Sequence, residues 1–316
     1  MKQFNIICYG EILLRFITDE AFGNNKKLNY FIGGAELNVA RHLANFNFHT
    51  NFVSILPNNY LSLKIIHVLK KENINTNHIL LNGNKMGIFF VPKKMDMQNQ
   101  GVIYDRVNSA FYKATLSDFN WQIILKNKHH FHTSAITTAL NKNQFNICLN
   151  AIKTAYNNGL NTSFDLNYRN SLWQYTNNPP NFIKKILPYC NTIIGNLWSV
   201  EKLIGIKSTI DSSKGKSISQ LIEAAEIQIK TLTTQFKNIK NIGYTFRLEN
   251  TYFAVFYINN KIIVSNIFNK KKSLDSVGSG DSFMATFIYG LHNKIPEKKL
   301  ANLCCKIALK KLKKPG

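Results

Sequence analysis

The chain has 316 residues, 45% of them hydrophobic, so it is long enough to bury one large core, with or without a small appended unit. It carries 40 lysines and arginines against 17 aspartates and glutamates, a formal net charge of +23, which by itself points to nucleic acid. The lysines are dispersed, apart from residues 270–272 and the tail "KIALKKLKKPG", and dispersed charge indicates a solvated surface. We therefore do not expect nucleic acid as the main partner.

The cysteines and the N-terminus indicate the compartment. No pair of cysteines has the spacing of a zinc site, and their number is odd, so we expect reduced thiols. The apolar stretch at residues 6–9 is too short for a signal peptide, and no apolar run is long enough to span a bilayer. We expect a cytoplasmic protein with no membrane partner. The cysteines are Cys8, Cys148, Cys190, Cys304 and Cys305.

Short apolar runs alternate with helical periodicity along most of the chain. The expected strands are 6–8, 50–55, 88–91, 129–133, 161–166, 192–195, 242–246 and 252–258. The expected helices are 36–45, 60–71, 143–157, 199–203, 218–235 and 281–289. This alternation predicts an α/β fold with a mostly parallel central sheet flanked by helices, whose ligands bind at the carboxyl ends of the strands.

Two stretches, about 11–32 and 85–110, break the alternation. They contain "ILLRF", "LNYFIGG", "KMGIFFVPKK" and "GVIYDRVN", which indicate strands joined by turns without helices. Together they predict a small β-sheet lying as a lid over one main domain that spans residues 1–316.

The diglycine of "GGAELNVARHLA", residues 33–44, opens a predicted helix. Glycines let the backbone approach a ligand closely, and the free N–H groups at a helix start can donate to it. The alternative is a tight connection from the lid to the helix. This motif alone leaves the two readings open.

Two further motifs place polar side chains beyond strand ends. In "SFDLNYRNSLW" Asp165, Asn167 and Arg169 alternate, so they share one side of an extended chain; the alternative is a surface pair of Asp165 with Arg169. In "VIYDRVNSA" Tyr104 and Arg106 share a face, which suits a polyhydroxylated acid. The alternative there is an exposed edge strand of mixed polarity.

The segment "DSVGSGD", residues 275–281, lies between a strand-like run and a helix. Gly278, Ser279 and Gly280 expose backbone N–H groups at a helix N-terminus, which suits a phosphate. Asp281 could accept the proton of an attacking hydroxyl, or it could cap the helix. The segment lacks the Walker A pattern.

Taken in order, "GGAELNVA", "YDR", "DLNYR" and "DSVGSGD" resemble the ribokinase-like (PfkB-type) carbohydrate kinases, from residue 10 to about residue 308. Within that family, "GEILLRF", "IYDRVNSA", "FHTSAIT", "DLNYRNSLW" and "IGNLWSVEKLIGI" are similar to 2-keto-3-deoxygluconate kinase. The resemblance implies a large α/β domain and a β lid with the substrate bound between them. It also implies transfer of the ATP γ-phosphate to a primary hydroxyl of that substrate.

The resemblance also implies roles by position. Asp281 is the expected general base, and Gly278, Ser279 and Gly280 form the expected anion hole. The expected substrate-binding residues are Gly34, Asn38, Phe89, Tyr104, Arg106, Asn167 and Arg169. The expected nucleotide-side residues are Asn196, Thr245, Arg247 and Asp275.

The resemblance implies ATP with Mg²⁺, leaves room for a monovalent cation, and implies a homodimer through the lid. The family commonly carries N-x-x-E from the position of Asn196; here Ser199 occupies the glutamate position, and Glu201 is out of step. The metal ligands therefore stay unassigned from the sequence.

Three functions stay open at this stage. The first is a kinase of 2-keto-3-deoxygluconate or a similar sugar acid. The second is a fructokinase- or ribokinase-type kinase of a neutral sugar. The third is a catalytically weakened scaffold or binding protein of the same fold.

Overall fold

A computed structural model of the chain describes residues 4–18, 29–92, 102–270 and 277–313. Its main sheet has the order β13-β12-β11-β10-β9-β8-β1-β4-β5, with β14 paired to β12. All neighbours from β11 to β5 are parallel, and β12, β13 and β14 form an antiparallel edge. The predicted, mostly parallel α/β fold is confirmed. The strands are β1 (Asn5–Tyr9), β4 (His49–Leu56), β5 (Ile74–Leu81), β8 (His130–Ser134), β9 (Asn161–Asp165), β10 (Thr192–Gly195), β11 (Asn241–Arg247), β12 (Thr251–Ile258), β13 (Lys261–Val264) and β14 (Phe268–Asn269).

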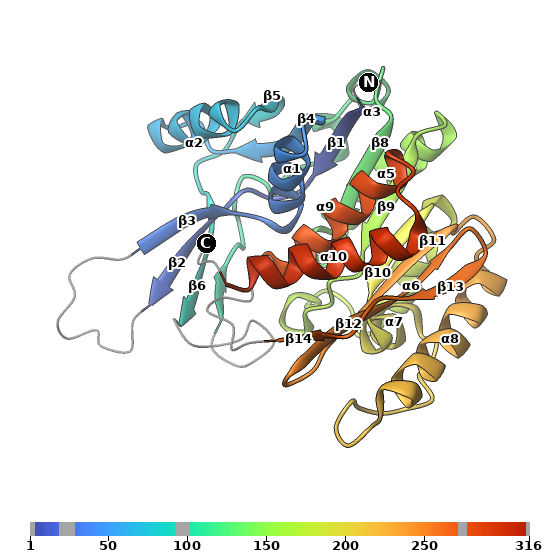
Figure 1. The fold of residues 1–316 in the computed structure, drawn as a ribbon. Helices are drawn as coiled ribbons and strands as arrows, with labels where there is room; N and C mark the ends of the chain where they lie inside the picture. The colour runs from blue at the N-terminus through green and yellow to red at the C-terminus, as the bar shows by residue number, and fades with distance from the viewer. Residues whose placement is uncertain (1–3, 19–28, 93–101, 271–276, 314–316) are drawn as a thin grey trace.

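Helices cover both faces of this sheet (Figure 1). One face is covered by α1 (Ala35–Asn45), α2 (Tyr60–Lys71), α9 (Ser279–His292) and α10 (Glu297–Lys311). The other face is covered by α3 (Trp121–Ile124), α5 (Lys142–Asn157), α6 (Pro180–Ile186), α7 (Leu197–Ile204) and α8 (Ile218–Gln235). Short turns of helix lie at α4 (Ala135–Thr138), Leu116–Asp118, Asn170–Leu172 and Leu187–Tyr189.

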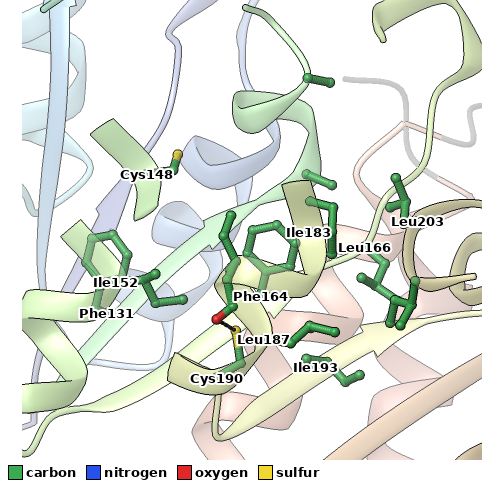
Figure 2. Packing of buried hydrophobic residues seen from close by; sticks show 14 of the residues in the cluster. Phe131, Cys148, Ile152, Phe164, Leu166, Ile183, Leu187, Cys190, Ile193 and Leu203 are labelled. Carbon is green, nitrogen blue, oxygen red and sulfur yellow. Dashed lines mark hydrogen bonds between the residues drawn. The ribbon is translucent and has the colours of Figure 1, made fainter. Parts of the chain in front are cut away.

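The two faces of the central strands differ in polarity. On one face Phe131, Phe164 and Ile193 are fully buried and pack in one cluster with Cys148 and Ile152 of α5 (Figure 2). Because side chains alternate along a strand, the intervening residues of β8 and β9 point to the opposite face, toward α1 and α9. On β8 and β9 that face is polar. Its polar residues extend to the carboxyl ends of the two strands, where ligands bind in such sheets.

A second, four-stranded sheet has the order β3-β2-β6-β7 and stands at one side of the main sheet (Figure 1). Its strands are β2 (Leu13–Thr18), β3 (Asn29–Gly33), β6 (Gly87–Pro92) and β7 (Ile103–Asp105). They lie in the two stretches that the sequence assigns to a lid, and we call this sheet the lid. In register, Arg15 lies opposite Phe31 and Phe89, and Phe89 lies opposite Tyr104, so these four side chains share one face.

The elements not expected from the sequence are β5, β13, β14, α3, α4, α6 and α10. The strand β5 follows α2 directly and mixes asparagines with apolar residues, so its pattern is weak. All five cysteines are buried free thiols. Across the described ranges, every helix is too short or too polar to cross a bilayer.

The polar face holds a row of histidines, of which His130 and His132 are buried and His292 is partly buried. Nδ1 of His130 lies 2.9 Å from Nε2 of His292, and both Nε2 of His130 and Nδ1 of His132 contact Oγ of Ser163, at 2.7 and 2.9 Å. Burial lowers the pKa of His292 to about 4 and that of His132 to about 3. These rings are therefore neutral in the folded protein at neutral pH.

This row predicts acid sensitivity. The unfolded state takes up protons at these histidines below about pH 6.5, whereas the folded state resists until about pH 4, so stability present above pH 6.5 is lost as the pH falls toward 4. We expect His292→Gln to flatten the loss of unfolding free energy between pH 7 and pH 4.5 by about 1–3 kcal/mol, measured by urea denaturation. His67→Gln, at an exposed site of α2, is the control; equal slopes for both variants would contradict the prediction.

Candidate active site

A pocket lies between the lid and the start of α9. The lid supplies one wall from β2, β3, β6 and β7, and the other wall comes from α1, the segment after β9, and α9. Its lining therefore combines apolar and aromatic side chains with three guanidinium groups and one carboxylate. The lining residues are Leu13, Arg15, Phe31, Ile32, Gly33, Gly34, Ala35, Asn38, Phe89, Tyr104, Arg106, Ile136, Asn167, Arg169, Val277, Gly278, Gly280 and Asp281.

Asp281 is the carboxylate of this pocket. Helix α9 has Gly278 as its N-cap with no side-chain cap, and Asp281 stands in the first turn, so the reading of Asp281 as the helix cap is wrong. Its Oδ2 instead accepts a hydrogen bond of 2.7 Å from Nδ2 of Asn38 on α1. Burial raises the pKa of Asp281 to about 7, against the lowering effect of the Asn38 hydrogen bond. A base with a pKa near neutrality suits proton abstraction.

The backbone next to Asp281 is shaped for an anion. Gly278 has φ +79°, a left-handed conformation that side chains disfavour, and it lines the pocket together with Gly280. A Cβ built on Gly280 would meet nothing within 4 Å, so the space above the helix start is open. Ser279 is different: its hydroxyl points away, toward the carbonyl of Ala308 at 3.4 Å. We call residues 278–280 the cradle.

Gly34 forms the facing edge of the pocket at the N-cap of α1. Its φ is +142°, and a Cβ there would lie 2.3 Å from the carbonyl oxygen of Glu11. Only glycine fits where the segment between β1 and β2 passes this close to the helix start. The diglycine is thus both a tight connection and a pocket wall, so the two readings of this motif are compatible.

Two more buried carboxylates lie near Asp281. Glu36 accepts hydrogen bonds from the hydroxyls of Ser134 at 2.6 Å and Thr137 at 2.7 Å, and burial raises its pKa. Asp165 accepts from the backbone N–H of Asn167 at 3.0 Å; burial, then the charge of Asp281, raises its pKa to about 7. Asp165 is only 5% exposed, so the reading of Asp165 with Arg169 as a surface pair is wrong.

Arg106 reaches the pocket from the end of β7 and has an internal partner. Its Nε donates to Oε2 of Glu11 at 2.7 Å, and Ser109 donates its hydroxyl to Oε1 of the same carboxylate at 2.6 Å. Nη1 of Arg106 is buried and has no hydrogen-bond partner among the described residues. Asp105 points the other way and pairs with Lys85, as the predicted alternation requires. The edge-strand reading of this segment is wrong for Arg106, which is 3% exposed.

Two other arginines line the pocket. Arg169 follows β9; its Nη1 donates weakly to the carbonyl of Tyr168 at 3.4 Å, and within the described part of the chain its buried Nε has no partner. Arg15, on β2 of the lid, lies with its guanidinium 4.7 Å from the ring centre of Phe31. All seven predicted substrate-side residues line this pocket. They are Gly34, Asn38, Phe89, Tyr104, Arg106, Asn167 and Arg169.

Three of the predicted nucleotide-side residues, Asn196, Thr245 and Arg247, lie outside this pocket lining. Asn196 caps α7: its Oδ1 accepts from the N–H of Ser199, and its own N–H donates to Oγ of Ser199, both at 2.8 Å. Thr245 donates to the carbonyl of Gly195 at 3.4 Å, and Arg247 ends β11. Asn196 follows β10, and Thr245 and Arg247 lie in the last three residues of β11, so all three are at the carboxyl edge of the sheet, as the pocket is. Asp275 lies outside the described residues.

Arg15, Glu11 and Glu36 belong to the site but are not among the site residues expected from the sequence. Alternation in "EILLRF" puts Arg15 on the same face as Leu13. That this face lines the pocket follows only from the pairing of β2 with β6, which joins segments far apart in the sequence. The partners of Glu11 and Glu36 come from segments about a hundred residues away. No short motif records such pairs.

The fold and the pocket define a ribokinase-like α/β protein with a lid over a site at the carboxyl ends of parallel strands. The sequence matches the pfkB family carbohydrate kinases over residues 3–316, and the chain belongs to that family. The structure of 2-dehydro-3-deoxygluconokinase from Thermotoga maritima superposes with a TM-score of 0.89 and is 30% identical, covering 99% of this chain and 95% of that one.

Two curated relatives are similar over part of their length. The 2-dehydro-3-deoxygluconokinase of Bacillus subtilis is 28% identical over 176 residues, which is 54% of this chain and 53% of the relative. The 2-dehydro-3-deoxygalactonokinase of Haloferax volcanii is 26% identical over 170 residues, 53% of each protein. The matched part thus spans about half the length of these two relatives.

Proposed function

We propose that the protein is an ATP-dependent sugar kinase that phosphorylates the primary hydroxyl of 2-keto-3-deoxygluconate or a similar sugar acid. The observation that carries the proposal is one pocket holding a buried carboxylate of raised pKa, an open anion cradle and arginines from opposite walls. Membership of the carbohydrate kinase family and the named 2-dehydro-3-deoxygluconokinase relatives support it.

Asp281 is the general base in this proposal. It takes the proton of the sugar hydroxyl as that oxygen forms a bond to the γ-phosphorus, while the bond from the γ-phosphorus to the β-phosphate oxygen breaks and ADP leaves. The N–H groups of the cradle face the charge on the transferring phosphoryl group. Asn38 holds the carboxylate in place from α1.

The acid-sugar part of the proposal depends on charge. A neutral sugar offers only uncharged oxygens, and no anionic group, to the cationic nitrogens of Arg106 and Arg169 that are buried without a partner in the described structure. A buried donor left unpaired is costly, and a substrate carboxylate would satisfy it with a charge-assisted hydrogen bond. Tyr104 and Asn167 line the same pocket and suit hydroxyl or carbonyl oxygens.

ATP brings Mg²⁺ in this proposal. The described residues hold no group of three His, Cys, Asp or Glu side chains placed to bind a metal ion, so the ion is expected to take most of its ligands from the phosphates and water, as Mg²⁺ commonly does. The open space over Gly280 and the helix start fit a phosphate. Asn196, Thr245 and Arg247 stay proposed nucleotide-side residues.

A substrate panel tests the function. ATP turnover is measured with purified protein, Mg²⁺ and, in parallel, 2-keto-3-deoxygluconate, 2-keto-3-deoxygalactonate, fructose and ribose. We expect kcat/KM for a keto acid to exceed that for either neutral sugar. A higher value for fructose or ribose would favour the neutral-sugar alternative, and no turnover with any sugar would favour the scaffold.

We also propose a homodimer through the lid. On the outer face of the lid, Tyr30, Phe16, Phe90 and Ile103 form one row in register across the four strands, and the rings of Phe16 and Phe90 stack at 5.5 Å. Tyr30 is 60% and Ile103 is 63% exposed. An exposed apolar row on a sheet face is the kind of surface that a second copy covers.

Introducing negative charge into this apolar row tests the proposed dimer. We expect the wild type to elute as a dimer in size-exclusion chromatography with light scattering, and Tyr30→Glu/Ile103→Glu to elute as a monomer, because burying two carboxylates in an apolar interface is unfavourable. Ile123→Glu, at a 66% exposed site on α3, is the control and should leave the dimer intact. A monomeric wild type or a dimeric double variant would contradict this proposal.

We place this enzyme in the cytoplasm. The five cysteines are free thiols, buried on both faces of the main sheet, which fits a reducing compartment. Localisation of a fluorescent fusion of the full chain tests this placement.

A further inference from the structure

The last helix brings a lysine to the cradle. Helix α10 packs against α9 and β12, and Figure 1 shows its C-terminal end reaching toward the lid side of the molecule. Lys311 is the final residue of α10. It is half-buried, whereas the flanking lysines Lys310 and Lys313 are exposed. The side chain of Lys311 is therefore less exposed to solvent than those of the neighbouring lysines.

Side-chain atoms of Lys311, Asn38 and Asp281 all approach one backbone position, Gly278. A Cβ built on Gly278 would lie 3.1 Å from Cε of Lys311, 3.7 Å from Nδ2 of Asn38 and 3.9 Å from Oδ2 of Asp281. The end of the Lys311 side chain therefore packs against Gly278, the first residue of the cradle. The carboxylate of Asp281 and the amide of Asn38 approach the same residue. Nζ is one bond beyond Cε, and the charge that it carries is among those that act on Asp281.

Electrostatics agree with this placement. The positive charge of Lys311 is among the influences that lower the pKa of Asp281. The pKa of His42 on α1 is lowered mainly by burial and, to a smaller extent, by the charge of Lys311. His42 is thus neutral near pH 7 and adds no competing charge. The other groups that act on Asp281 are Asn38 and Glu36 from α1, Arg169 after β9, and Asp165 at the end of β9.

We propose that Lys311 is a positioning residue for phosphoryl transfer, which supplies fixed positive charge behind the cradle and keeps Asp281 in its proton-accepting form. This inference rests on the proposed kinase function. In the step, the sugar hydroxyl oxygen bonds to the γ-phosphorus, its proton passes to Asp281, the bond to the β-phosphate oxygen breaks, and Lys311 keeps its own proton throughout. Its charge opposes the build-up of negative charge on the phosphoryl oxygens next to Gly278.

Lys311→Met tests the proposal because it keeps the aliphatic packing on Gly278 and removes the charge. We expect kcat at pH 7 to fall by about tenfold to a hundredfold with little change in the KM for the sugar. We also expect the acid limb of the kcat/KM profile to move up by roughly half to one pH unit, because an ionised Asp281 is then less favoured. Lys311→Arg should restore most of both.

The matched control is Lys310→Met, at the exposed neighbouring position of the same helix. It removes the same charge from the protein and should leave both kcat and the pH profile unchanged. Unchanged kcat and profile in Lys311→Met would overturn the proposal, and so would equal changes in the Lys310→Met protein.

A readout without turnover separates this inference from the proposed function. The pKa of the Asp281 carboxyl is followed by ¹³C NMR in protein labelled at aspartate, with Asp281→Asn identifying the signal. If the wild type turns over no sugar, the proposed function fails, but a higher pKa of Asp281 in Lys311→Met than in Lys310→Met still supports the placement of Lys311. An equal pKa in the two variants overturns it.

Discussion

Replacing Asp281 by asparagine is expected to lower kcat by roughly 10²- to 10⁴-fold, the usual loss when a general base is removed. The amide is close to isosteric and can still accept the Asn38 hydrogen bond, but it cannot take the proton of the sugar hydroxyl. Consistent with this role, kcat/KM of the wild type should fall as the pH drops below about 7, where burial places the pKa of Asp281. Steady-state kinetics from pH 5.5 to 9 measures both.

The fold should survive this change. Because the pKa of Asp281 is raised in the folded state, its ionisation works against folding above that pKa, so a neutral amide should not lower the melting temperature at pH 8. Asp105→Asn is the control, since that carboxylate is half exposed, pairs with Lys85 and lies outside the pocket lining. Turnover of the Asp281→Asn protein at the wild-type rate would exclude Asp281 as the base.

Replacing Arg106 by methionine is expected to change two properties at once. The kcat/KM for a keto acid should fall by about 10²-fold while that for fructose changes little, because a charge-assisted hydrogen bond to the carboxylate is lost. The unfolding free energy should also fall by about 3–5 kcal/mol, because Glu11 is left as a buried charge without its cation. Kinetics and urea denaturation measure the two effects.

The double variant Glu11→Gln/Arg106→Met separates these effects. Removing both charges should restore much of the stability, since Ser109 can still hydrogen-bond the amide oxygen, but it should not restore the preference for the acid. Glu11→Gln alone should keep that preference. If the double variant recovers acid selectivity together with stability, Arg106 is structural and the charge argument for the substrate fails.

Much of the architecture could be predicted from local patterns. The runs at 192–195, 60–71 and 218–235 have the same bounds as β10, α2 and α8, because hydrophobic periodicity and turn residues act within a few positions of the chain. The weaker alternation of "INTNHILL" hid β5, whose place at the edge of the sheet depends on pairing with β4. Pairing of that kind is a long-range property.

The same division applies to the site. The sequence alone determined which side chains follow strand ends and start helices: Tyr104 with Arg106, Asn167 with Arg169, and the cradle with Asp281. It could not determine their partners. Asn38 meets Asp281 across 243 positions and Arg106 meets Glu11 across 95, and only the packing of α1 on α9 and of the lid on the main domain creates these contacts.

Tertiary structure therefore decided the chemistry. Burial raises the pKa of Asp281 to about 7, the pairing with Glu11 leaves one guanidinium nitrogen of Arg106 for a ligand, and the return of α10 sets Lys311 against Gly278. A pKa depends on desolvation and on charges that approach through space, and neither quantity is written in the local sequence. The sequence names the reacting groups, and the fold sets the charge state in which they meet a substrate.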